Sequence, residues 1–309
     1  MKNCYKILIG CFVVCLLLVV ADFAVGTWCE MLYHKSKYGI YHRQLYCLNK
    51  SNDDILIMGS SRAAHHYIPQ IFEDSLGMNC YNAGSDGQCI YYHYALLASM
   101  LERGAKPRLV LYEVMNLDAE VSSIGSFTLD AALDRLAPHY GEYRAIDELF
   151  NQKKCWMENL KLKSKTYRYN SKLVQIIKCN YIPSPEYKGY EALIGKMDIK
   201  SFTKDLEKES NTIKHKSADI DGSKLEYVKK FIMLCKENDI RLVFMYSPYY
   251  NSDLSYGTKL IKKIAESEGI PFYDFVTNSI FNTPEYFKDV MHLNDEGARE
   301  YSKYIIQYL

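Results

Sequence analysis

The segment Asp54-Ile-Leu-Ile-Met-Gly-Ser-Ser-Arg62 joins a short apolar run to a turn of small residues. Such a run is typical of a strand that is buried on both faces of a parallel sheet. In open α/β sheets, ligands bind beyond the carboxyl ends of the strands. The segment therefore predicts an α/β fold that presents a serine at the edge of its sheet. The alternative is a Gly-Ser turn that only caps the following helix.

A second motif, Asp289-Val-Met-His292, lies close to the C-terminus. An aspartate three residues before a histidine can turn its carboxylate onto one ring nitrogen and leave the other free as a general base. An activated serine needs such a base. The alternative is a helix-capping aspartate beside a solvated histidine.

Together, the early Gly-x-Ser and the late Asp-x-x-His resemble the SGNH (GDSL-type) hydrolase superfamily, over about residues 54–297. The resemblance implies that Ser61 is the nucleophile, His292 the base and Asp289 its orienting partner. It also implies a flavodoxin-like fold and acyl transfer through a covalent acyl-serine.

The resemblance further implies an oxyanion hole. Its second motif is matched by residues 81–87, in which Gly87 is the expected donor, and Asn116 stands at the place of its third motif. The backbone N–H groups of Ser61 and Gly87 and the side-chain amide of Asn116 are expected to converge on the oxygen that becomes negative during acyl transfer.

The chain departs from the family pattern in two motifs. Ser60 replaces the usual aspartate, Arg62 replaces the usual leucine, and Asn116 lacks the glycine and aspartate that normally flank it. Asn116 can equally be an ordinary polar residue that closes a strand. Arg62 is a candidate for binding an anionic or hydroxyl-rich substrate, and its alternative is a charge on a helix surface.

The N-terminus holds an apolar run, residues 7–21, that extends to Trp28 with Asp22 as its one interruption. A membrane-spanning helix needs ~20 predominantly apolar residues. We therefore expect residues 1–28 to be a retained membrane anchor. The alternative is a signal peptide cleaved at the small residues 24–26.

Lysines on the two sides of this run indicate its orientation. Lys2 and Lys6 precede it, whereas Lys35 and Lys37 follow it and are offset by Glu30. The positive-inside rule then places the remaining domain, residues 29–309, outside the cytoplasm.

Further apolar runs alternate with helical patterns after the first strand. This strand–helix–strand rhythm predicts a three-layer α/β/α domain around a five-stranded parallel sheet with right-handed crossovers. A capping-box pattern at Ser223 predicts the start of one helix, and Asn294 is expected to cap the last. The four further strands are expected at residues 78–82, 108–113, 241–247 and 271–276.

Residues 118–220 break this rhythm and predict a helical insertion that serves as a lid or binding wall. Within it, the stretch Lys153–Lys178 carries eight lysines or arginines and one glutamate. Such a stretch is usually a solvated helical face. If it faces the Ser61 cleft, an acidic glycan or a membrane surface is the expected partner.

Composition limits the function classes. The net charge of +1 gives no case for nucleic acid binding. The ten cysteines form no Cys-x-x-Cys pair, so we expect no metal and no cofactor, and disulfide pairing cannot be read from the sequence. The 28 tyrosines suit buried positions and sugar-stacking surfaces equally.

The expected function is a membrane-anchored, extracytoplasmic serine esterase that acts on O-acyl groups, O-acetyl above all, of surface glycans. One alternative is an O-acyltransferase that uses the same triad with a sugar hydroxyl as acceptor and works with a membrane-bound acyltransferase. Another is a non-catalytic glycan-binding or scaffold protein, which the departures in the family motifs favour.

Overall fold

A computed structural model describes residues 2–198, 219–276 and 280–309 of the chain. The chain divides into two compact units. One is helical and comprises residues 1–42 and 133–183, and the other comprises residues 43–132 and 184–309 and contains the central sheet. All the candidate catalytic residues belong to this second, α/β unit.

The described residues of the α/β unit form a five-stranded parallel sheet in the order β2-β1-β3-β6-β7. This is the strand order of flavodoxin-like folds, and it confirms the predicted fold class. Each strand lies within two residues of its predicted position. The strands are β1 (Ile55–Gly59), β2 (Cys80–Asn82), β3 (Leu109–Glu113), β6 (Arg241–Tyr246) and β7 (Phe272–Asp274).

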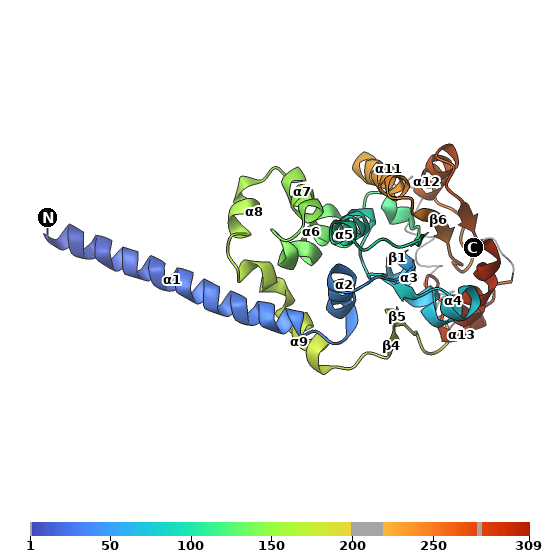
Figure 1. Ribbon diagram of the computed structural model, residues 1–309, viewed down its shortest axis with the longest axis horizontal. Coiled ribbons are helices and arrows are strands. Elements are labelled where there is room, and N and C mark those ends of the chain that lie inside the picture. Colours follow the sequence, from blue (N-terminus) through green and yellow to red (C-terminus); the bar gives the residue numbers. More distant parts are fainter. Residues whose placement is uncertain (1, 199–218, 277–279) are drawn as a thin grey trace. The chain divides into compact units, whose positions relative to one another are not determined.

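Helices cover both faces of this sheet (Figure 1). The apolar residues of β1 and β3 point to both faces of the sheet, so both faces need cover. All residues of the two strands are buried as a result. On one face lie α3 (Ser61–His66), α4 (Pro69–Leu76) and α13 (Asp295–Ile305); on the other lie α5 (Ile90–Glu102), α11 (Gly222–Glu237) and α12 (Tyr256–Ser267).

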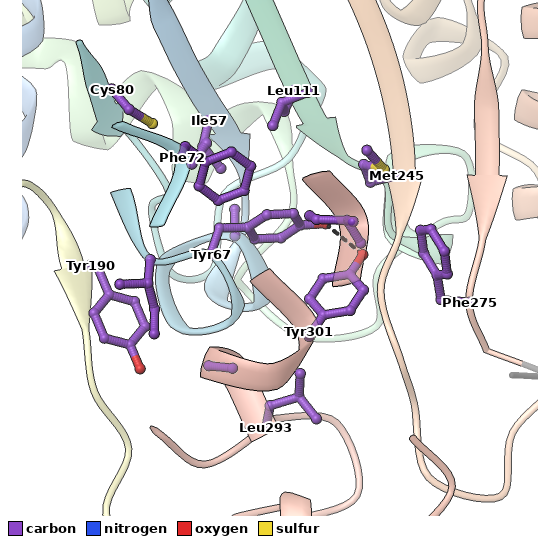
Figure 2. Packing of buried hydrophobic residues seen from close by; sticks show 14 of the residues in the cluster. Ile57, Tyr67, Phe72, Cys80, Leu111, Tyr190, Met245, Phe275, Leu293 and Tyr301 are labelled. Atoms are coloured by element: carbon purple, nitrogen blue, oxygen red, sulfur yellow. Dashed lines mark hydrogen bonds between the residues drawn. The ribbon is translucent and has the colours of Figure 1, made fainter. Parts of the chain in front are cut away.

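Aromatic side chains pack among aliphatic ones in the core under α3 and α13 (Figure 2). The rings of Tyr67 and Tyr301 meet edge to face with centroids 5.4 Å apart, and their hydroxyls lie 3.3 Å apart. Phe275 packs against Tyr301, and Leu293 is fully buried in the same cluster. Burying Leu293 fixes the segment that carries the neighbouring His292.

The helix caps agree with the sequence in one case and differ in another. Asn294 caps α13 as predicted, because its side chain accepts the backbone N–H of Gly297. The prediction that Ser223 caps α11 is wrong. Asp221 is the cap, since its carboxylate accepts the N–H groups of Ser223 and Lys224, and a carboxylate is a strong N-cap acceptor.

The helical unit is built on the long helix α1 (Lys2–His34), whose segment Cys4–His34 is long and apolar enough to cross a membrane. Of the predicted insertion, residues 133–183 belong to this unit, and residues 199–218 lie outside the described residues. The lid role of residues 118–220 stays a prediction.

The remaining elements of the two units are α2 (Gly39–Asn49), η1 (Asn116–Asp118), α6 (Leu129–Leu136), η2 (Ala137–His139), α7 (Arg144–Gln152), α8 (Trp156–Lys161), η3 (Tyr167–Lys172), α9 (Leu173–Tyr181), β4 (Glu186–Tyr187), β5 (Tyr190–Glu191), η4 (Pro284–Tyr286) and η5 (Ile306–Tyr308).

Candidate active site

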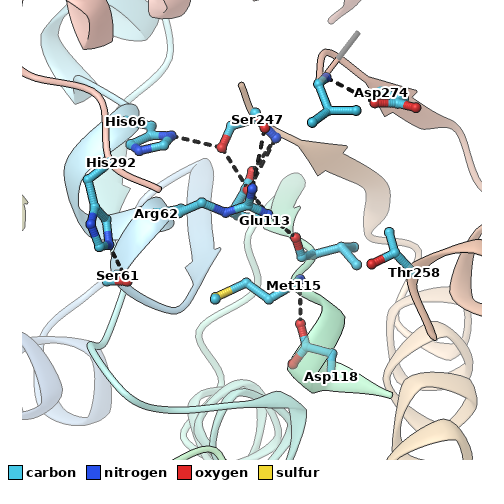
Figure 3. Close-up of polar contacts among 12 residues, drawn as sticks. Ser61, Arg62, His66, Glu113, Met115, Asp118, Ser247, Thr258, Asp274 and His292 are labelled. Atoms are coloured by element: carbon cyan, nitrogen blue, oxygen red, sulfur yellow. Dashed lines mark hydrogen bonds and ion pairs between the residues drawn. The ribbon is translucent and has the colours of Figure 1, made fainter. Parts of the chain in front are cut away.

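The turn between β1 and α3 presents Ser61 at the carboxyl edge of the sheet. Gly59 makes the turn at a φ of +134°, and a Cβ there would lie 2.6 Å from the carbonyl oxygen of Glu113. Only glycine meets both conditions. Ser61 is the first residue of α3, and its Oγ lies 2.8 Å from Nε2 of His292 (Figure 3).

The Asp289–His292 turn orients the histidine as its spacing predicts. Nδ1 of His292 lies 2.9 Å and 3.0 Å from the two carboxylate oxygens of Asp289. The carboxylate also accepts the backbone N–H groups of Met291 at 2.9 Å and His292 at 3.0 Å. The ring proton therefore sits on Nδ1, and Nε2 is left to accept the Ser61 hydroxyl proton.

These hydrogen bonds also favour the ionised form of Asp289. Partial burial by itself would raise the pKa of this carboxyl. The bonds from His292 and from the two backbone amides outweigh burial, so the pKa is lowered from its usual value. The Asp289 side chain is 53% exposed and that of His292 is 16% exposed, so the site is open to water.

A buried histidine holds the backbone beside His292. The N–H of Leu293 donates to Nε2 of His66 at 2.9 Å. Because Nε2 is the acceptor, the ring proton of His66 lies on Nδ1, which donates to Oγ of Ser247 at 2.8 Å. Burial, together with the nearby charges of His292 and Arg62, lowers the pKa of His66 well below its usual value. His66 is thus a neutral linker.

The chain of hydrogen bonds continues to a buried carboxylate. Ser247 donates from Oγ to Oε1 of Glu113 at 2.8 Å (Figure 3). Glu113 also accepts the hydroxyl of Tyr67 and pairs with Nη2 of Arg62 at 2.8 Å. We call His66, Ser247, Glu113 and Arg62 the buried relay. It ties the carboxyl ends of β1, β3 and β6 to the loop that carries His292.

Arg62 differs from both readings of the sequence. It is 1% exposed, its guanidinium pairs with Glu113, and it donates to the carbonyl oxygen of Val114 at 2.6 Å. It also stacks on the ring of Tyr246, 4.2 Å from the centroid. Successive helical residues are about 100° apart, so Ser61 faces the sheet edge while Arg62 turns inward. Neither substrate binding nor a surface charge is supported for Arg62.

The two expected oxyanion donors, Gly87 and Asn116, differ in the hydrogen bonds that their residues already make. Gly87 follows β2 with a φ of +72°, and its carbonyl oxygen accepts the N–H of Phe127. The amide of Asn116 donates to Oε2 of Glu120 at 3.0 Å. Asn116 must leave Glu120, or use its second N–H, to serve as an oxyanion donor. Both oxyanion roles stay predictions.

A second histidine borders the site on the Gly87 side. His65 donates from Nδ1 to the carbonyl oxygen of Glu191 at 2.7 Å, and its Nε2 lies 3.8 Å from a carboxylate oxygen of Asp86. Its ring meets that of His292 edge to face at 5.6 Å. Burial lowers the pKa of His65, but Asp86 and Glu191 outweigh burial and the pKa is raised.

Sequence reasoning did not find the roles of His66, Glu113 and Ser247. The signal available for two of them was a polar residue at the carboxyl end of an apolar strand, but that position alone names no partner. Among the described residues, no group of histidine, cysteine, aspartate or glutamate side chains is arranged to hold a metal ion.

Comparisons with known proteins find likeness in structure but none in sequence. No protein-family model matches the chain, and no curated protein matches it in sequence. One similar solved structure is described as a candidate acylhydrolase from Bacteroides fragilis, with 14% identity, a TM-score of 0.37, and coverage of 84% of this chain and 87% of the other.

Two further solved structures are similar. One is a candidate lipolytic protein of the G-D-S-L family from Desulfitobacterium hafniense, with 12% identity, a TM-score of 0.38, and coverage of 83% of this chain and 99% of the other. The other is a GDSL-like lipase from Bacteroides thetaiotaomicron, with 11% identity, a TM-score of 0.35, and coverage of 82% and 85%. The assignment of Ser61, His292 and Asp289 rests on the geometry of this chain alone.

Proposed function

We propose that the chain is a serine esterase of SGNH type. The observation that carries the proposal is the continuous hydrogen-bonded alignment from Ser61 through His292 to Asp289, which joins residues 231 positions apart in the chain. The alternative, a turn serine and a helix-capping aspartate, does not account for both residues bonding to the same histidine in the tautomer that a general base requires.

In the proposed reaction, Oγ of Ser61 attacks the ester carbonyl carbon while Nε2 of His292 takes the hydroxyl proton. The backbone N–H groups of Ser61 and Gly87 stabilise the oxygen that becomes negative. The alcohol leaves with the proton from His292, and an acyl-serine remains. Water then attacks this ester while His292 accepts a proton from it; His292 returns the proton to Oγ of Ser61 as the Oγ–acyl bond breaks and the carboxylic acid leaves. Asp289 keeps the imidazole oriented throughout.

The openness of the site supports hydrolysis over transfer. A transferase must exclude water from its acyl-enzyme so that a sugar hydroxyl can react instead. Here the Asp289 side chain is half exposed and His292 is partly exposed. Hydrolysis by solvent is the reaction that such a site performs without further cover.

Packing within the helical unit supports a retained anchor over a cleaved signal peptide. The carboxylate of Asp22 accepts the hydroxyl of Ser164 at 2.6 Å and the N–H groups of Lys165 and Thr166 at 2.9 Å and 3.1 Å. A Cβ on Gly26 would lie 2.6 Å from Lys165. Cleavage after Gly26 would remove Asp22 and with it these contacts.

The proposed substrate follows from the proposed location. With α1 in the membrane and the positive-inside orientation, the site lies outside the cytoplasm. Esters within reach of an anchored extracytoplasmic domain include the O-acyl groups of surface glycans, and these groups, O-acetyl above all, are the proposed substrates.

Covalent labelling of the full-length protein in detergent with a fluorophosphonate tests the proposal. Wild type is expected to be labelled, and Ser61→Ala and His292→Ala are expected to lose labelling. Ser60→Ala is the matched control, because Oγ of Ser60 is buried with no hydrogen-bond partner in the described part of the chain. Loss of labelling in Ser60→Ala alone would overturn the assignment.

A second measurement distinguishes the acceptor and the substrate. The measurement is acetate release from an O-acetylated polysaccharide. An esterase is expected to release acetate as wild type and not as Ser61→Ala. Acetyl transfer to an added glycan without acetate release would instead identify the acyltransferase alternative. Absence of labelling in folded wild-type protein would favour the non-catalytic alternative.

A further inference from the structure

The anchor helix has a polar residue at an unusual depth. The apolar run of residues 7–21 is 15 residues long, which corresponds to about 22 Å of helix. The hydrocarbon core of a bilayer is ~30 Å thick. With the charge of Lys6 marking the other end of the span, a helix of this length extends past Asp22 by about five residues, which would place the Asp22 carboxylate at the inner edge of the membrane interface.

A carboxylate at that depth needs hydrogen-bond partners. Residues 164–166 supply them, through the Ser164 hydroxyl and the N–H groups of Lys165 and Thr166. Gly26 lets this segment approach the helix backbone closely. A membrane-spanning α1 would therefore hold residues 164–166 at the same depth as Asp22, inside the membrane interface and not above it.

The side chain of Lys165 has the geometry expected at such a boundary. Its backbone bonds Asp22, whereas its ammonium pairs with Glu30 at 2.6 Å, eight residues further along α1. The same ammonium lies 5.1 Å from the centroid of the Phe23 ring. A lysine whose stem lies at the apolar level and whose charge reaches toward water is snorkelling.

Helix α8 ends only three residues before this segment, and its surface is apolar. Trp156 is 70% exposed and Leu160 is 58% exposed, with Met157 also exposed beside them. In Figure 1, α8 lies on the side of its unit that faces the free, N-terminal half of α1. Exposed tryptophan and leucine flanked by lysines are typical of helices that lie in the membrane interface. The lysines in and around α8 are Lys153, Lys154, Lys161, Lys163 and Lys165.

A groove at the same level offers room for lipid. It has a volume of about 440 Å³, and its walls include Leu18 and Val25 of α1 and Tyr167 and Asn170 of η3. The anchor contributes apolar residues and Asp22, and the neighbouring segment contributes mostly polar ones, a combination that matches a phospholipid at the junction of its acyl chains and headgroup.

We propose that the helical unit is seated in the membrane interface, with Trp156, Met157 and Leu160 of α8 among the lipid headgroups and acyl-chain ends and the adjacent lysines on anionic headgroups. The proposal rests on the retained anchor of the proposed function. It adds that the anchor holds α8 against the lipid surface and is not a flexible tether. Its test involves no catalytic readout, so its failure leaves the esterase proposal intact.

The chain contains two tryptophans, Trp28 and Trp156, so single-tryptophan proteins are available. Full-length Trp28→Phe, which reports Trp156, is reconstituted in phosphatidylcholine vesicles with and without phosphatidylglycerol. Full-length Trp156→Phe reports Trp28, a half-exposed residue on the anchor itself. Lipids with brominated acyl chains quench tryptophans in the membrane, and aqueous iodide quenches those in water.

The expected result is that brominated lipids quench Trp156 to an extent comparable with Trp28, more strongly when phosphatidylglycerol is present, and that iodide has little effect on either. In the Trp28→Phe background, Leu160→Glu is expected to reduce lipid quenching of Trp156. Val174→Glu is the matched control, because Val174 is also an exposed aliphatic residue but lies on α9 outside the patch, and it should leave quenching unchanged.

Three outcomes would overturn the proposal. Quenching of Trp156 by iodide alone, with Trp28 quenched by lipid, would mean that α8 stands in water above an inserted anchor. Protection of Trp156 from both quenchers would mean that a protein surface covers α8. Absence of lipid quenching of Trp28 as well would mean that the anchor itself does not span the membrane.

Discussion

Replacing His66 by leucine is expected to slow catalysis without altering substrate binding. The ring of His66 accepts the N–H of Leu293 at 2.9 Å and donates to Ser247 at 2.8 Å. Leucine places an apolar side chain of similar bulk at this fully buried position and removes both hydrogen bonds. Ser247 still donates to Glu113, so the principal loss is the acceptor for Leu293.

The size of the effect follows from that one amide. A buried donor left without a partner costs about 1–3 kcal/mol, which is well below the ~5–15 kcal/mol stability of a typical domain. The variant should therefore fold. The unsatisfied N–H belongs to the residue after His292, so the loop can recover the cost only by moving the catalytic base. If that cost reappears in the transition state, kcat falls about 5- to 160-fold.

The assay is hydrolysis of p-nitrophenyl acetate by the full-length protein in detergent, with kcat and KM measured separately. We expect kcat to fall and KM to stay near the wild-type value, because His66 positions the base and touches no substrate. His66→Gln, whose amide oxygen can accept the Leu293 N–H, should recover part of the loss. A folded His66→Leu protein with wild-type kcat would refute the reasoning.

Two further predictions concern the charges around the site. Glu113→Gln should destabilise the α/β unit by about 3–5 kcal/mol, because Arg62 stays buried without its charged partner, whereas Arg62→Met combined with Glu113→Gln should cost less, because no charge stays buried and the glutamine can still accept from Ser247 and Tyr67; denaturant unfolding measures both, and equal losses would contradict the account. Asp86→Asn should lower the melting temperature more at about pH 5 than at about pH 9. The pKa of His65 is raised in the folded protein, so its pairing with Asp86 stabilises the fold. This stabilisation is complete below the unfolded pKa of ~6.5 and is lost as pH rises through the folded pKa. Asp86 is partly exposed, so this difference is small, and a larger effect at the alkaline end would reverse its sign and reject the assignment.

Much of the fold could be predicted because its signals are local. The apolar runs of β1 and β3 and the turn residues that follow them identified strands in a parallel sheet. Parallel strands bring their carboxyl ends to one edge, so Ser61 and His292 could be expected to meet although no local signal links them. Asp289 lies three residues from His292, and this spacing is short enough to predict their contact.

The residues around the triad could not be predicted in the same way. Arg62 next to the nucleophile looks like a surface or substrate-binding charge until Glu113 is known to face it from β3. His66 adjoins a second histidine in the sequence, and nothing local separates their roles. His66 turns to the His292 loop and His65 to the Gly87 side, because adjacent helical residues point in different directions.

The sequence by itself determined the strand positions, the serine-bearing turn, the Asp289–His292 pair and the apolar helix at the N-terminus. Tertiary structure alone decided which polar residues are buried together in the relay and that residues 164–166 cap Asp22 on the anchor. The physical reason is one of range. Periodicity and turn chemistry act over a few residues and are written in the chain, whereas the partner of a buried charge or hydrogen-bonding group comes from whichever distant segment the packing brings to it.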